Sequence, residues 1–206
     1  MLGFSTFECS ARSAILAFTL TIAVPCMVVG AALVPSADNG LADLMNRLAL
    51  RQHGHVSFVE RQFLGILDRA TETSGELLYD APDRLEKRTL KPKPESLILD
   101  HGTLAIQRGK YARSLSLRDY PHIGLFIDSI RETLAGDLAA LNRSYTLAFK
   151  TGSDGWTLVL IPRDARLADL IANIQVSGVS DEIHMIEFRR VNGDHSVMTL
   201  SPLPGT

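Results

Sequence analysis

The sequence has little cysteine, with only Cys9 and Cys26 among its 206 residues. Both stand in the first 37 residues, so a chain processed after that segment can form no disulfide bond and must be stabilised by burial of apolar side chains. The sequence also lacks an excess of either charge, with 21 lysines and arginines against 23 aspartates and glutamates. Nucleic-acid binding needs a basic surface and is therefore not expected.

Catalytic motifs are missing as well. The sequence has no G-x-S-x-G elbow and no glycine-rich phosphate loop before a helix. His53 and His55 are spaced for a shared metal ion, but no carboxylate or thiol stands beside them to complete its coordination. We interpret Glu60, Glu76 and Glu86 as carboxylates on a solvated face, because basic residues are interleaved with them. We therefore expect neither an enzyme nor a metal or other cofactor.

A long uncharged run, Ala14 to Val34, follows Arg12 near the N-terminus. Such a run indicates export, either as a signal peptide or as a membrane anchor. We favour a cleaved signal peptide over residues 1–37, because a proline and a glycine interrupt the run and small residues follow it. The mature domain would then span residues 38–206 and lie in the periplasm. A segment retained as an inner-membrane anchor is the alternative.

The segment from Gly75 to Ile106 predicts consecutive short strands. Apolar and polar residues alternate within it, and three turn signals divide it: Ala81-Pro82-Asp83, Lys91-Pro92-Lys93-Pro94 and Asp100-His101-Gly102. Sequential strands of this kind usually pair as neighbours, so the segment is typical of a β-meander. The meander predicts a concave surface that holds a ligand rather than transforms it.

Helices and further strands are expected on either side of the meander. Helical spacing of apolar residues predicts helices over 41–52 and 121–134, while 138–141 is either helix or loop. Further strands are predicted at 56–67, 110–120, 145–150, 156–161, around 174–176, 183–191 and 196–200. The chain is therefore expected to be a mainly β (α+β) domain, whose long antiparallel sheet must curl and bury its helices on the concave side.

The order of these features resembles the periplasmic lipoprotein-carrier (LolA-like) family over nearly all of 38–206. The resemblance is carried by Phe58-Val59-Glu60-Arg61-Gln62, Gly75-x-Leu77, Pro82, Pro94, the Asp100-x-Gly102 hairpin, the central apolar helix and the Asn192-Gly193-Asp194 hairpin. It implies an incomplete antiparallel β-barrel of about eleven strands, whose helices cap a hydrophobic cavity for the acyl chains of a lipidated client.

One position departs from that family. The well-studied carriers have an arginine before the proline that aligns with Pro82, and that arginine is implicated in holding a helical lid closed. This chain has Ala81 there. The sequence therefore resembles a divergent LolA-related branch, and we extend the expected client from lipoproteins to free lipids and other lipid-linked products.

The residues of the cavity follow from the alternation of apolar positions within this fold. The predicted lining consists of Leu77, Tyr79, Leu97, Leu99, Leu104, Ile106, Trp156 and Leu158. The predicted lid consists of Phe126, Ile127 and Ile130 on the central helix. All are aliphatic or aromatic, as an acyl-binding wall requires.

The expected function is that of a monomeric periplasmic carrier. It would take lipoprotein acyl chains or a free lipid from an inner-membrane donor and move them towards an outer-membrane acceptor. Two alternatives remain open from the sequence: a membrane-anchored module that binds or senses lipid, and an enzyme that acts on an acyl or glycan substrate.

Overall fold

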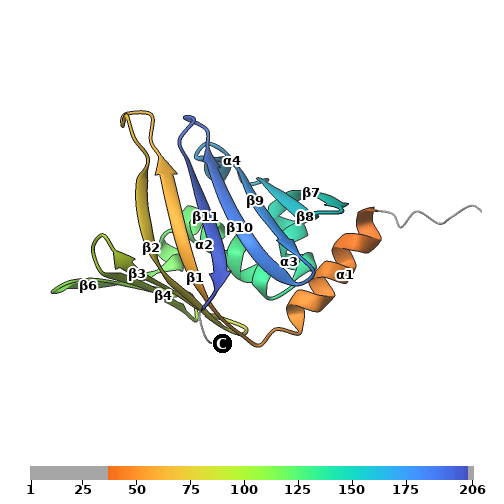
Figure 1. The fold of residues 1–206 in the computed structure, drawn as a ribbon, viewed down its shortest axis with the longest axis horizontal. Coiled ribbons are helices and arrows are strands. Elements are labelled where there is room, and N and C mark those ends of the chain that lie inside the picture. Colours follow the sequence, from red (N-terminus) through yellow and green to blue (C-terminus); the bar gives the residue numbers. More distant parts are fainter. Residues whose placement is uncertain (1–36, 204–206) are drawn as a thin grey trace, which may run out of the picture. The chain divides into compact units, whose positions relative to one another are not determined.

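A single antiparallel sheet dominates residues 37–203, the part of the chain that the computed structural model describes (Figure 1). Its eleven strands are β1 (His53–Phe63), β2 (Thr71–Asp80), β3 (Arg84–Lys91), β4 (Glu95–Asp100), β5 (Thr103–Arg108), β6 (Tyr111–Ser116), β7 (Tyr145–Gly152), β8 (Gly155–Pro162), β9 (Ile171–Val179), β10 (Glu182–Arg190) and β11 (His195–Pro202). Their order is β6-β5-β4-β3-β2-β1-β11-β10-β9-β8-β7, so β6 and β7 are edge strands. The predicted mainly β architecture is confirmed, and the sheet is not closed into a barrel.

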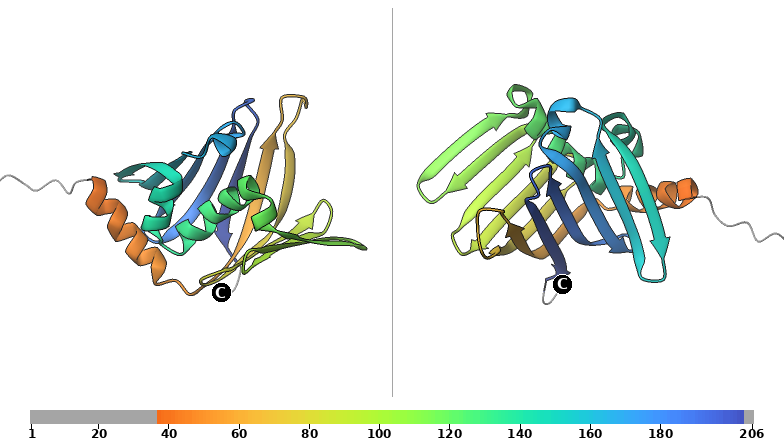
Figure 2. Two further views of the ribbon diagram at one scale, coloured as in Figure 1. Left: turned by 180° about the vertical axis from the view of Figure 1, so that it is seen from behind. Right: turned by 90° about the horizontal axis from the view of Figure 1, so that it is seen from above.

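The helices lie on one face of this sheet, which we call the inner face (Figure 2). They are α1 (Ala37–Ala49), the 3₁₀ turn η1 (Leu117–Asp119), α2 (Pro121–Leu134), α3 (Leu138–Ser144) and α4 (Ala165–Ala168). The helix predicted over 121–134 is confirmed, and 138–141 belongs to a helix rather than a loop. The strand predicted over 56–67 ends earlier, at Phe63, because Leu64 and Leu67 form a turn through a backbone hydrogen bond of 2.9 Å.

The predicted signal peptide or anchor, 1–37, lies outside the described residues except for Ala37, as do both cysteines. Within residues 37–203, no helix is long and apolar enough to cross a membrane.

The packed core occupies the β7–β11 half of the sheet. Side chains with at most 2% of their surface exposed gather there from α1, α3, β7, β8 and β9: Leu44, Met45, Leu48, Leu141, Tyr145, Leu158, Leu160, Ile174 and Val176. In the β2–β5 part of the described chain, by contrast, Tyr79 and Leu99 are the hydrophobic side chains that are buried. The β7–β11 half of the inner face is therefore fully packed, and the β2–β5 part is only partly covered.

Helix α2 connects the two halves. On the packed side, the Tyr145 hydroxyl donates to a backbone carbonyl of α2 at 2.7 Å, and burial raises the pKa of Tyr145 to about 12. The ring of Phe126 packs on that of Phe188 in β10, with centroids 4.7 Å apart. On the other side, Arg131 of α2 donates to Asp83, in the turn between β2 and β3, at 3.1 Å. The helix is thus attached at both sides of the open half.

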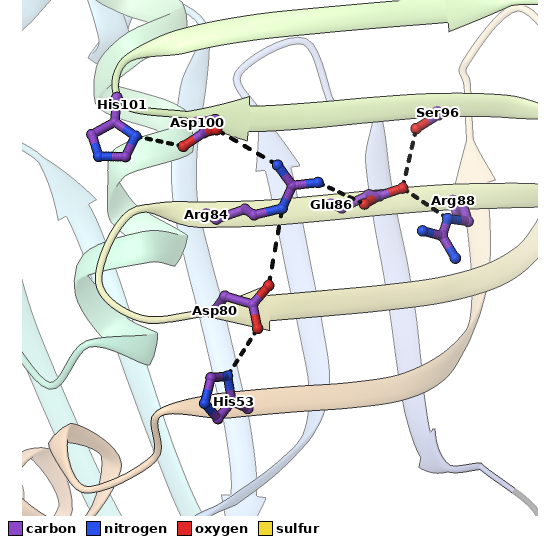
Figure 3. Close-up of polar contacts among 8 residues, drawn as sticks. All are labelled: His53, Asp80, Arg84, Glu86, Arg88, Ser96, Asp100 and His101. Atoms are coloured by element: carbon purple, nitrogen blue, oxygen red, sulfur yellow. Dashed lines mark hydrogen bonds and ion pairs between the residues drawn. The ribbon is translucent and has the colours of Figure 1, made fainter.

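A polar network on the outer face joins β1 to β4 (Figure 3). Arg84 lies 3.6 Å from Asp100 and 3.9 Å from Asp80, which also contacts His53 at 2.9 Å. Glu86, expected on a solvated face, has only 6% of its surface exposed and accepts hydrogen bonds from both neighbouring arginines of its strand. The expectation for Glu86 was wrong, because these long side chains cover its carboxylate.

Gly75 allows β2 and β3 to approach at a register irregularity. A Cβ at this position would lie 1.9 Å from the carbonyl oxygen of Arg88. We expect Gly75→Ala to lower the free energy of unfolding by about 2–3 kcal/mol, because the two strands must separate. Urea unfolding measures this. Gly152→Ala is the control: no atom lies within 4 Å of its Cβ, so stability should stay within about 1 kcal/mol of the parent. Equal stability of the two variants would contradict the argument.

Glu132 of α2 should make the fold less stable as pH rises. Burial, assisted by the charge of Asp128, raises its pKa from 4.5 to about 6, and its Oε2 has no hydrogen-bond partner among the described residues. Between these two values the folded chain holds a proton that the unfolded chain has released, so stability falls as pH increases through this window.

Glu132→Gln removes this titration. We expect it to gain about 1–2 kcal/mol over the parent at pH 7.5 and almost nothing at pH 4, measured by urea unfolding at both pH values. A free energy of unfolding that changes equally with pH in the parent and the variant would show that Glu132 does not cause the loss of stability at high pH.

Candidate functional site

A cavity of about 370 Å³ occupies the partly covered half of the inner face. Its walls come from β1–β5, β10 and β11, and α2 covers it. Most of its lining side chains are aliphatic or aromatic. We call this space the apolar cavity.

Strand register builds one wall of the apolar cavity from two rows of side chains. The first row, running across β2–β5, is Tyr79, Leu85, Leu99 and Leu104. The second row is Leu77, Lys87, Leu97 and Ile106. Because side chains alternate between the faces of a strand, both rows point to the inner face.

The structure brings most of the residues predicted for the site together. Those that line the apolar cavity from the sheet are Leu77, Tyr79, Leu97, Leu99 and Leu104. The residues predicted as the lid, Phe126, Ile127 and Ile130, line it from α2. The Tyr79 hydroxyl is buried without a hydrogen-bond partner among the described residues, and burial raises its pKa.

Three residues predicted for the lining lie elsewhere. Ile106 ends the second row on β5 and is not part of the cavity wall. Trp156 and Leu158 are on β8, near the opposite edge of the sheet, where they belong to the packed core. The Trp156 indole N–H donates to the Ser180 carbonyl at 2.9 Å. Alternation within a strand predicts the face of a residue, but not whether a helix already fills that part of the face.

A partly buried ion pair was missed by the sequence reasoning. Glu60 of β1 points to the inner face with 5% of its surface exposed, and Lys87 of β3 donates to its carboxylate. The Lys87 ammonium also lies 5.0 Å from the centre of the Phe58 ring. The prediction of a solvated face was wrong for Glu60. Its alternation with Phe58 was the available signal, because the two share one face of β1.

The C-terminal hairpin also contributes lining that the sequence did not predict. Its residues are Ile183, Ile186 and Phe188 of β10 and Met198 and Leu200 of β11. They reach the cavity because β11 pairs with β1 in the middle of the sheet.

At the cavity edge, Arg51 donates to Asp181 at 2.6 Å, and this hydrogen bond lowers the pKa of Asp181.

The histidines considered as metal ligands contact carboxylates instead. His53 lies 2.9 Å from Asp80, and His55 lies 3.1 Å from Glu76. Residues 37–203 contain no group of three or more histidine, cysteine, aspartate or glutamate side chains placed to hold a metal ion.

Solved structures with a similar chain path are distant in sequence. A LolA superfamily protein from Nitrosomonas europaea is 11% identical, with a TM-score of 0.41 over 79% of this chain and 90% of its own. A putative outer membrane lipoprotein-sorting protein domain from Vibrio parahaemolyticus is 10% identical, with a TM-score of 0.43 over 82% and 94%. A chain in the Pseudomonas aeruginosa MucA/MucB complex is 13% identical, with a TM-score of 0.45 over 79% and 56%. No curated protein sequence matches.

The sequence itself matches a family model over most of its length. The model describes an outer membrane lipoprotein carrier protein, LolA-like, and it matches residues 32–202. The matched range contains every residue that lines the apolar cavity. The chain therefore belongs to the LolA-like family of outer membrane lipoprotein carrier proteins.

Proposed function

We propose that this protein is a monomeric periplasmic carrier that holds the acyl chains of a lipoprotein or another lipid-linked client in the apolar cavity and moves the client towards the outer membrane. The apolar cavity is the observation that carries this proposal. Its volume of about 370 Å³ falls in the range of about 300–1,000 Å³ that is typical of small-molecule sites. Each methylene buried there contributes about 0.8 kcal/mol before the cost of ordering the ligand.

The wall of the cavity still has apolar surface to bury. Leu77, Leu85, Leu97 and Leu104 are only partly buried, although they form continuous rows on the inner face. The corresponding positions of β8 and β9 are fully buried under α1 and α3. A bound acyl chain would cover the exposed leucine surface and gain the hydrophobic free energy that the fold itself leaves unused.

Helix α2 is the lid in this proposal. A carrier must also release its client, so the cover of the cavity has to move. Where the well-studied carriers have an arginine before the proline that aligns with Pro82, this chain has Ala81, but Arg131 of α2 contacts Asp83 of the same turn. An arginine–carboxylate pair thus joins the lid to the turn, with the arginine on the lid. We infer that this pair holds the lid closed.

Acyl binding can be tested with a matched pair of substitutions on β4. Leu97 lines the apolar cavity, whereas Ile98 is its neighbour on the outer face. We expect Leu97→Gln to weaken the binding of a fluorescent fatty acid about tenfold, because the amide loses its water when the acyl chain packs on it. Ile98→Gln should leave the affinity unchanged. Fluorescence titration measures both. A parent protein that takes up no acyl probe would overturn the carrier function.

The lid contact can be tested through the rate of release. Removing the charge of Asp83 with Asp83→Asn should speed the release of a bound fluorescent fatty acid about two- to fivefold, the range expected for a partly exposed ion pair. Stopped-flow dilution measures this rate. Glu72→Gln is the control, because Glu72 pairs with Arg61 on the outer face at 2.9 Å, far from the lid contact in the fold. An unchanged release rate in Asp83→Asn would remove this pair from the mechanism.

A further inference from the structure

A second cavity of about 560 Å³ adjoins the apolar cavity. Glu60, Phe126 and Phe188 line both spaces and therefore form their common boundary. The second cavity lies over the ends of β1, β10 and β11 and is bordered by α4 and the turn between β10 and β11. Its wall combines the aliphatic side chains of Leu64, Leu167, Leu170 and Ile171 with the polar side chains of Gln62, Asp169, Arg190, Asn192, Asp194, His195 and Ser196. We call this space the polar chamber, after the polar groups that distinguish it from the apolar cavity.

Several of these side chains have unused hydrogen-bonding groups. Gln62 and Ser196 are opposite each other on β1 and β11, and Arg190 ends β10. Among the described residues, none of these three side chains has a hydrogen-bond partner. They present amide, hydroxyl and guanidinium groups to a common space.

The outer face near these strand ends is different. Arg61, the neighbour of Gln62, donates to Glu72 at 2.9 Å, and Arg189, the neighbour of Arg190, lies 2.7 Å from Glu187. These outer-face arginines are thus paired with glutamates. In the polar chamber Asn192 donates to Asp194 at 2.9 Å, whereas the solvent-accessible side chains of Gln62, Arg190 and Ser196 have no hydrogen-bond partner among the described residues. A cavity with a largely apolar wall and a few polar groups that can hydrogen-bond to a ligand is typical of small-molecule sites.

The boundary with the apolar cavity carries a further acceptor. One carboxylate oxygen of Glu60 accepts from Lys87, and the other has no hydrogen-bond partner among the described residues. The Glu60 side chain is 7% exposed, and Lys87 faces the apolar cavity. A ligand that extends from one cavity into the other would meet the Glu60 carboxylate as an acceptor and the Lys87 ammonium as a donor at the junction. An acyl chain in the apolar cavity would end there, and the polar part of the ligand would begin.

The charges around the polar chamber favour an uncharged ligand. Glu60, Asp169 and Asp194 supply three carboxylates, against the two cations Arg190 and Lys87. Hydrogen bonds, above all the one from the Gly65 amide, lower the pKa of Asp194. This excess of negative charge opposes a phosphate group. Ligand hydroxyl groups match this combination of donors and acceptors, because each hydroxyl can donate to a carboxylate and accept from an amide or guanidinium group.

We propose that the polar chamber binds the uncharged, polyhydroxylated head group of a glycolipid whose acyl chains occupy the apolar cavity. This assignment rests on the proposed acyl-binding function and names the class of its client. Phe126 and Phe188 separate the two parts of the ligand, and Gln62, Arg190 and the free oxygen of Glu60 hydrogen-bond to the sugar hydroxyls.

Three competitors with the same alkyl chain test the proposal: an alkyl glucoside, an alkyl phosphate and the plain alcohol. Each is titrated below its micelle concentration against the full-length protein loaded with a fluorescent fatty acid. The glucoside should displace the probe at about one tenth of the concentration that the alcohol needs, as expected for one or two added hydrogen bonds to charged groups. The phosphate should show no such advantage.

Variants then assign the effect to the polar chamber. Gln62→Leu combined with Arg190→Leu should reduce the tenfold advantage of the glucoside to about twofold or less, while the alcohol binds at least as well as before. Arg61→Leu is the control, because its side chain lies on the outer face beside Gln62, and it should keep the advantage.

The outcomes separate the two levels of the argument. Equal displacement by the glucoside and the alcohol would overturn the head-group site and leave acyl binding intact. Strongest displacement by the alkyl phosphate would overturn the uncharged head group. Failure of the fluorescent fatty acid itself to bind would overturn the proposed carrier function.

Discussion

The antiparallel register of β2–β5 aligns apolar side chains in rows across the inner face, and the wall of the apolar cavity is built on this alignment. A slip of one residue would turn a whole row to the outer face. The contacts of Arg84 and Glu86 on the outer face, together with the close approach at Gly75, oppose such a slip. The polar network on the outer face and the apolar cavity on the inner face therefore both follow from the register of β2–β5.

The open half of the sheet contrasts with the packed half because the helices are unevenly placed. Helices α1 and α3 cover the inner face near β7–β9, where the hydrophobic core is complete. Helix α2 covers the other half, and it is held there by unequal contacts. The Tyr145 side chain that donates to α2 is fully buried, whereas both side chains of the Arg131–Asp83 pair are partly exposed, so that this pair is weaker. Movement of α2 would therefore begin at the Arg131 end.

The ion pair of Glu60 and Lys87 has a different role from the ion pairs of the outer face. Partial burial of two charges beside an apolar cavity costs desolvation that a leucine pair would avoid, so the pair contributes little to stability. In the proposed glycolipid complex, its position at the boundary with the polar chamber would orient the ligand. An amphiphile would be bound in one direction, with its chain on one side of Phe126 and Phe188 and its head on the other.

The sequence by itself determined the elements, the turns and the face to which most side chains point, because alternation and turn chemistry are local. It therefore predicted Leu77, Tyr79, Leu97, Leu99 and Leu104 together on one wall. It did not predict that Trp156 and Leu158 belong to the packed core, that Glu60 lies beside Lys87 on the inner face, or that β11 pairs with β1. Only the tertiary structure decided these, because long-range strand pairing and helix coverage, which no local pattern encodes, determine which part of a face is filled and which stays hollow.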